Sequence, residues 1–198
     1  MNFMGRKILL IGALVPVLFL VACATHIKSS SVKNPPPSEA FANFTAFEMK
    51  PAALAPAFEN NEANQRALAK IQENLSAGMT PSLNKWNQVG ATKAGAERTL
   101  VIESVVTDIK FIAGAVRFFV GPIAGSSAIV MRATITEKEN GKVVAAPEFY
   151  AVGGTWKGSF TMGVTDNLML TRVAGELRDY LIANYASAIG GPTGARRR

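Results

Sequence analysis

The stretch AIVMRATITEKENGKVVAAPEFYAV (residues 128–152) decides the fold class, because its pattern predicts two strands joined by a tight turn. Its first half alternates apolar and polar side chains, which is typical of a strand with one buried face. Asn140 and Gly141 accept the positive φ angles of a hairpin turn, so the second half is predicted to return antiparallel. Pro147 lacks a backbone donor and therefore predicts an edge or bulged strand at that point.

Two further strands are predicted before this hairpin. Residues 99–111 (TLVIESVVTDIKF) are rich in β-branched side chains, which favours a central strand. Aromatic and other residues alternate imperfectly from Phe41 to Met49, and this pattern predicts a first strand that Pro51 and Pro56 stop.

Two amphipathic helices complete the predicted domain. Asn60 or Asn61 can cap the first helix, and Thr80 with Pro81 is predicted to restart it. The second helix begins near Asp166 and runs to Gly190. Apolar residues recur at helical spacing in both, at Leu68, Ile71, Leu75, Met79, Leu83 and Trp86, and at Leu170, Val173, Leu177 and Leu181. The expected fold is α+β, a mainly antiparallel sheet with helices packed on one face.

The N-terminus has the order of a secretory signal. Two basic residues precede an unbroken apolar run over residues 8–22, which is shorter than the roughly 20 residues of a spanning helix. The run ends in LVAC (residues 20–23), which resembles the lipobox cut by the lipoprotein signal peptidase. Residues 1–22 are therefore predicted to be a cleaved signal peptide, and Cys23 the lipidated first residue of the mature chain.

The resemblance to bacterial lipoproteins implies a membrane anchor. It implies several acyl chains on Cys23, such as palmitate, and each buried CH₂ adds about 0.8 kcal/mol, so the attachment to the lipid bilayer is firm. Ala24 stands where an aspartate usually signals retention in the inner membrane, so we expect an outer-membrane location facing the periplasm. Cys23 is the only cysteine, and the domain is therefore expected to be stable without disulfides.

The mature chain is predicted to have three parts. Residues 23–39 are expected to be the lipidated cysteine and a flexible tether, because serine and proline replace apolar residues there, and the tether would let the domain stand off the membrane. Residues 40–189 form the single α+β domain. Residues 190–198 are expected to be a disordered basic tail behind a Gly/Pro-rich lead-in.

The net charge of +7 does not indicate a nucleic-acid-binding protein. Removing Arg6 and Lys7 with the signal leaves 19 basic and 14 acidic residues, a charge of +5. Three of these positive charges are the terminal residues 196–198, which leaves about +2 on the folded part. A nucleic-acid-binding face would need clustered Lys and Arg, whereas here they are scattered among acids.

One glycine-rich segment carries a family resemblance. Residues 111–130 read FIAGAVRFFVGPIAGSSAIV and contain Gly114, Arg117, Gly121 and Gly125 between two predicted strands. They resemble the central signature of small bacterial lipoproteins grouped as domain of unknown function 4410, and the similarity covers roughly residues 40–185 together with the lipobox. The family has no known role, so the resemblance implies a fold and an envelope location but no activity.

The same segment does not predict a membrane helix. Arg117 near its middle would cost about 2.5 to 3.5 kcal/mol on insertion scales, and Gly121 with Pro122 would break the helix. A hairpin or bulged connection is expected instead. Arg117 would then either pair with Asp108 or Glu103 or contact a partner.

Few residues of the chain are candidates for catalysis. The only histidine, His26, lies in the predicted tether, so no hydrolytic triad or imidazole metal site is expected. Glu103 and Asp108 are the candidate carboxylate pair, but a separation of five residues places them on opposite faces of a regular strand. Trp156 beside Lys157 fits a half-buried aromatic at a sheet edge better than a sugar site.

These patterns predict a non-enzymatic accessory or binding module of the envelope. We expect no cofactor, no metal and no nucleic-acid partner, and we expect envelope proteins as partners. Two alternatives stay open: a carrier that holds an apolar or amphipathic ligand between helices and sheet, and an enzyme that uses carboxylates alone. The sequence does not predict the oligomeric state.

Overall fold

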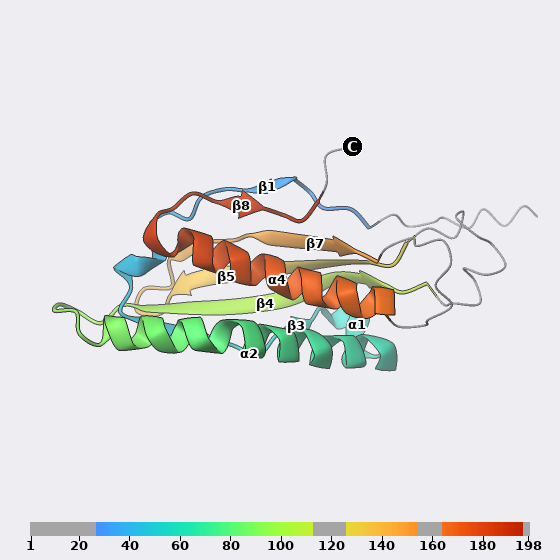
Figure 1. Cartoon of the computed structure of the whole chain (residues 1–198), viewed down its shortest axis with the longest axis horizontal. Helices are drawn as coiled ribbons and strands as arrows, with labels where there is room; N and C mark the ends of the chain where they lie inside the picture. Colours follow the sequence, from blue (N-terminus) through green and yellow to red (C-terminus); the bar gives the residue numbers. More distant parts are fainter. Residues whose placement is uncertain (1–26, 113–125, 154–163, 196–198) are drawn as a thin grey trace, which may run out of the picture.

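The computed structural model describes residues 27–112, 126–153 and 164–195 (Figure 1). Its helical elements are η1 (Phe41–Asn43), α1 (Pro56–Glu59), α2 (Glu62–Gly90) and α4 (Val164–Ala186). Its strands are β1 (Lys33–Asn34), β2 (Ala46–Met49), β3 (Ala53–Leu54), β4 (Thr99–Lys110), β5 (Ala128–Glu137), β6 (Val143–Ala145), β7 (Glu148–Val152) and β8 (Gly191–Pro192).

The described domain has one main sheet with two long helices on one of its faces (Figure 1). Strands β4 and β5 pair antiparallel at its centre. Strands β2 and β3 pair in parallel with β4, while β6 and β7 pair antiparallel with β5. Helices α2 and α4 pack on each other and on the sheet. The predicted fold class, α+β with a mainly antiparallel sheet, is confirmed.

Helix α2 begins at the predicted cap but does not stop at its proline. The Asn61 side chain accepts hydrogen bonds from the backbone N–H groups of Ala63 and Asn64, at 2.9 and 3.2 Å. The predicted restart at Pro81 is wrong, because one continuous helix runs from Glu62 to Gly90. Buried side chains on both sides of Pro81 share the same core, and this packing offsets the lost backbone hydrogen bond.

Helix α4 buries the apolar stripe that its spacing predicts. Leu170, Val173, Leu177 and Leu181 are all buried. The helix ends at Ala186, and the buried Asn184 side chain accepts hydrogen bonds from the N–H groups of Ile189 and Gly190, both at 2.8 Å. These bonds turn the chain back toward the sheet.

The hairpin is confirmed, and Pro147 shapes it more than the pattern predicts. Gly141 adopts a φ of 69°, but the positive φ predicted for Asn140 is wrong, since among the described residues only glycines have one. The turn is longer than the two-residue form, and Gly141 N–H closes it by donating to Glu137 O at 2.8 Å. The returning segment forms two short strands, β6 and β7, because Pro147 interrupts the pairing and only its carbonyl contributes, accepting from Ala133 N–H at 2.9 Å.

The predicted strand over residues 41–49 is wrong in its first half. Phe41 begins a 3₁₀ turn, which brings Phe41 and Phe44 to the same side, and both rings are fully buried. The strand itself begins only at Ala46.

The predicted tether and tail largely belong to the fold. Strand β1 pairs antiparallel with β8, so the flexible-tether prediction is wrong for residues 27–39 and the disordered-tail prediction is wrong for residues 190–195. Backbone bonds tie both segments to the sheet: Tyr150 N–H donates to Thr193 O at 2.7 Å, and Ser38 N–H to Val144 O at 2.8 Å. Hydrogen bonds along the sheet edge hold these segments in place, rather than burial of apolar side chains. Amino-acid composition does not reveal such bonds.

Amide side chains close the edges of the sheet. At the β2 edge, Asn87 of α2 accepts from Phe47 N–H at 2.7 Å and donates to Phe47 O at 3.2 Å. At the β7 edge, Asn34 makes the same pair of bonds with the backbone of Glu148. Exposed strand edges invite pairing with other chains, and these amides occupy the groups that would pair.

Candidate functional site

Apart from Glu103 and Asp108, the residues singled out from the sequence as candidates for function lie outside the part that the structure describes. This holds for the lipidation site Cys23 and for the signature Gly114, Arg117, Gly121 and Gly125. His26, Trp156, Lys157 and the terminal arginines also lie outside it. The described residues instead form polar clusters that the sequence did not reveal.

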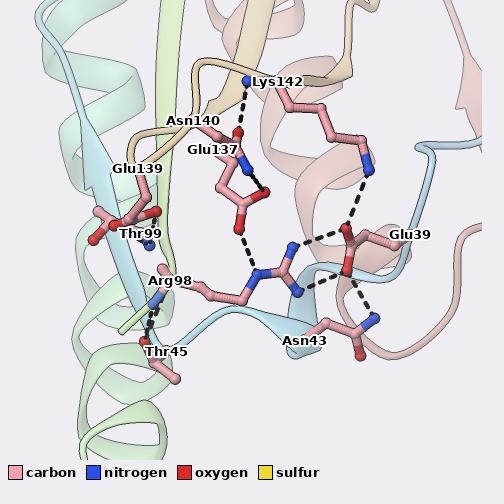
Figure 2. A network of polar contacts seen from close by, with 9 residues as sticks. All are labelled: Glu39, Asn43, Thr45, Arg98, Thr99, Glu137, Glu139, Asn140 and Lys142. Carbon is pink, nitrogen blue, oxygen red and sulfur yellow. Dashed lines mark hydrogen bonds and ion pairs between the residues drawn. The ribbon is translucent and has the colours of Figure 1, made fainter. Parts of the chain in front are cut away.

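The largest such cluster surrounds Arg98, which directly precedes β4 (Figure 2). Its two terminal nitrogens donate to the two carboxylate oxygens of Glu39, at 3.0 and 2.9 Å. Its Nε donates to Glu137, the last residue of β5. The guanidinium carbon also lies 4.4 Å from the centre of the Phe44 ring, in a cation–π contact.

Residues of the hairpin turn contact both carboxylates that bind Arg98. Asn140 donates to the second oxygen of Glu137 at 2.8 Å and accepts from the Lys142 N–H at 2.8 Å. The Lys142 ammonium lies 3.8 Å from the Glu39 oxygen that also accepts a hydrogen bond from Arg98 (Figure 2). The turn therefore positions both carboxylates around one arginine.

A backbone link joins the same arginine to the start of β2. Arg98 N–H donates to the Thr45 hydroxyl at 2.8 Å, and Thr45 N–H donates to Arg98 O at 2.9 Å. Next along the chain, Thr99 N–H donates to the Glu139 carboxylate at 2.9 and 3.0 Å. The cluster thus holds together the N-terminal segment, β2, β4 and the hairpin.

The carboxylates of this cluster are all held in the charged form. Hydrogen bonds from Arg98 lower the pKa of Glu39 to about 2 and also lower the pKa of Glu137. Burial is the largest influence on Glu139 and opposes its ionisation, but hydrogen bonds from the Thr99 amide, from its own backbone and from the Thr99 side chain together lower the pKa of Glu139. A general acid needs a raised pKa, so this geometry suits a structural clamp and not proton transfer.

A second cluster surrounds Glu148 at the start of β7. One carboxylate oxygen accepts three bonds, from Ser30 N–H at 2.7 Å, the Ser30 hydroxyl at 2.9 Å and the Ser29 hydroxyl at 3.0 Å. The other oxygen accepts from Arg132 Nε at 3.0 Å. Burial raises the cost of the charge, yet these bonds lower the pKa of Glu148 below its ordinary value. The cluster binds the N-terminal segment to the sheet.

The candidate carboxylate pair shares one face of the sheet, contrary to the prediction. A register shift between Val106 and Asp108 adds a residue to β4, so Glu103 pairs with Thr134 and Asp108 with Val130, both on the same face of β5. These partners are four residues apart, a separation of about 13 Å along a strand. Catalytic carboxylate pairs lie roughly 5 to 9.5 Å apart, so this arrangement does not suit glycoside hydrolysis.

The other sequence-based alternatives find little support among the described residues. Aliphatic and aromatic side chains fill the layer between helices and sheet, where the carrier alternative would place its ligand. A pocket of about 440 Å³ lies instead along β1, β8 and the residues after α4. In residues 27–112, 126–153 and 164–195, no group of three His, Cys, Asp or Glu side chains is arranged to hold a metal ion.

Comparisons with known proteins give similarity at the level of structure only. No protein-family model matches the chain, and no curated protein matches it. The PelC dodecamer from Paraburkholderia phytofirmans gives a TM-score of 0.41 at 14% identity, over 80% of this chain and 97% of that chain. A "putative lipoprotein" from Caulobacter crescentus gives a TM-score of 0.38 at 10% identity, over 72% of this chain and 92% of that chain.

No helix in residues 27–112, 126–153 or 164–195 combines the length and apolar composition that a membrane span requires.

Both polar clusters escaped prediction from sequence for the same reason. Glu39 and Arg98 are 59 residues apart, and Ser30 and Glu148 are 118 apart. Only the Asn140–Gly141 turn gave a local signal near either cluster, because it fixed the position of Glu137 relative to Lys142.

Proposed function

We propose that this chain is a bacterial lipoprotein, anchored by acyl chains on Cys23, whose domain is a non-enzymatic binding or accessory module facing the periplasm. The observation that carries the proposal is how close to Cys23 the described residues are already fixed to the sheet. Ile27 already accepts a hydrogen bond from the Tyr150 hydroxyl at 3.2 Å, and Cys23 lies four residues upstream. A signal peptide cleaved before Cys23 would leave the described domain intact.

Further support comes from the core and from the charged groups. The core side chains lie between Phe41 and Leu181, so a domain without residues 1–22 retains them. The clustered carboxylates have lowered pKa values and are held by arginines, which favours a module that binds over one that transfers protons.

Replacing the sulfur tests the anchor. Cys23→Ser is expected to yield an unprocessed precursor without acyl label, because the thioether needs the sulfur. Wild-type protein, expressed with a clickable fatty acid, should be shortened and labelled. Normal size and continued labelling of the variant would refute the lipoprotein proposal.

A second variant tests which of the two membranes holds the protein. We expect wild-type protein to fractionate with the outer membrane and Ala24→Asp to shift toward the inner membrane. Recovery of the wild type mainly with inner-membrane vesicles would refute the outer-membrane proposal and leave the anchor standing.

A further inference from the structure

We infer that the domain stands directly on the bilayer that holds Cys23, with one defined end toward the lipid and the Arg98 cluster at the opposite end. The inference rests on the proposed lipidation of Cys23. The end of the described domain that carries Ile27 would face a phospholipid bilayer.

The N-terminal segment runs along the whole side of the domain. The Tyr150 hydroxyl, from the middle of β7, donates to Ile27 O, while Ser38 N–H donates to Val144 O in β6. Residues 27–38 therefore run antiparallel to β6 and β7, and Figure 1 shows them along this side. The chain joins the domain at the end where β4 and β7 finish and where α2 and α4 begin (Figure 1).

Glu148 fixes this segment close to its start. Its carboxylate accepts three hydrogen bonds from Ser29 and Ser30, while Asn34 bonds to its backbone on both sides. The segment is thereby tied at two successive points within eight residues of Ile27. A tether in this position would give the domain free rotation, but a docked segment does not.

The remaining reach is short compared with the domain. Ile27 lies four positions after Cys23, and a fully extended chain spans at most about 14 Å over that distance. The twelve residues of β4 alone extend for about 40 Å. Acyl chains in the bilayer therefore hold the Ile27 end at the lipid surface, and Lys28 beside it adds a cation that anionic headgroups attract.

The opposite end carries the Arg98 cluster and the hairpin. Glu137, Asn140 and Lys142 close the β5–β6 turn there, with Val143 exposed beside them. This end stands away from the lipid and is the part of the described domain most accessible to periplasmic partners.

Single fluorophores at the two ends test the orientation. Cys23 is the only cysteine, so acylation leaves no free thiol and one new cysteine labels uniquely. Leu168→Cys lies near the start of α4, at the Ile27 end, and Val143→Cys lies at the hairpin end; both side chains are about half exposed. Each lipidated full-length protein is placed in phosphatidylethanolamine/phosphatidylglycerol vesicles that contain lipids with a headgroup quencher.

The expected result is several-fold stronger quenching of the probe at position 168 than at position 143. Equal quenching, or stronger quenching at position 143, would overturn the orientation while the lipoprotein proposal stands. Absence of acylation and of vesicle binding would instead overturn the proposed function and this inference with it.

Two variants test the Glu148 contacts. Glu148→Ala should reduce the difference between the probes, because it frees the segment and lengthens the reach. The double variant Ser29→Ala with Ser30→Ala removes two hydroxyl donors but leaves the Glu148–Arg132 pair, and it should reduce the difference to a smaller extent. An undiminished difference in both variants, with normal melting curves, would show that these contacts do not set the orientation.

Discussion

The Asn34 side chain bonds to the backbone of Glu148 in the way that a neighbouring strand would. The Asn34 amide donates to Glu148 O at 2.9 Å, and its oxygen accepts from Glu148 N–H at 2.8 Å. Both residues are buried. The side chain thus satisfies two polar groups that burial would otherwise leave unpaired.

Asn34→Ala is expected to lower the free energy of unfolding by about 1–3 kcal/mol, because it leaves the two backbone groups of Glu148 without these bonds. Chemical denaturation measures the change. Asn167→Ala, at an exposed position of α4, is the matched control and should change stability by less than about 0.5 kcal/mol. Equal effects of the two substitutions would contradict the edge role of Asn34.

Arg98→Ala is expected to flatten the acid dependence of stability. The pKa of Glu39 is about 2 in the folded protein and 4.5 ordinarily, so its contribution is complete above pH 4.5 and is lost as the pH falls toward 2. Without Arg98 the folded pKa of Glu39 should rise, and the loss in this range should shrink. Denaturant titrations from pH 2 to pH 7 measure both profiles.

Parallel pH profiles for the wild type and Arg98→Ala would show that Arg98 does not set the pKa of Glu39. Arg66→Ala is the control, because its partner Glu62 lies on the exposed face of α2. It should leave the profile unchanged, since exposed ion pairs contribute little.

Two buried serines are expected to respond to alanine in opposite directions. The Ser104 hydroxyl, which faces Ala133 across β4 and β5, has no hydrogen-bond partner among the described residues. Ser104→Ala should therefore be neutral or raise stability by about 1 kcal/mol. Ser127→Ala should lower stability by about 1–3 kcal/mol, because the hydroxyl accepts from Ile112 N–H at 3.1 Å. Thermal melts of both variants measure these changes. A loss of stability in Ser104→Ala would indicate that the Ser104 hydroxyl has a hydrogen-bond partner after all.

Two helical glycines provide a test of helix packing. A Cβ at Gly90 would lie 1.8 Å from the Thr45 carbonyl oxygen, whereas a Cβ at Gly175 would meet nothing within 4 Å. Gly90→Ala should therefore displace the end of α2 from β2 and cost more than about 2 kcal/mol. Gly175→Ala should gain about 0.5–1 kcal/mol from helix propensity. Similar melting temperatures for the two variants would refute the close approach of α2 to Thr45.

Local patterns in the sequence predicted the elements whose causes are themselves local. The Asn61 cap lies within three residues of the amides it binds, and the Asn140–Gly141 turn joins adjacent strands. The stripe on α4 repeats every few residues, so its buried face could be read directly. These features need no knowledge of distant parts of the chain.

The features that the sequence did not predict depend on distant partners or on one irregular residue. Composition alone indicated a tether at Ser29–Ser31, because the carboxylate that orders this segment, Glu148, is over 100 residues away. The register shift near Thr107 changed the face on which Asp108 lies, and no turn residue marks it. Pro81 signalled a break that packing on both sides overrides.

The pairing of β1 with β8 also sets the order in which the molecule can be completed. Lys33 and Pro192 lie near opposite ends of the described chain, yet they are direct partners. A polypeptide that emerges from its amino end must present nearly all of its length before this contact can close, and contacts between such distant residues form slowly. Until residues 191–193 arrive, Tyr150 lacks the Thr193 carbonyl to which its N–H donates. The unfinished chain therefore exposes a strand edge to its neighbours, and such an edge invites pairing with other chains until β8 arrives.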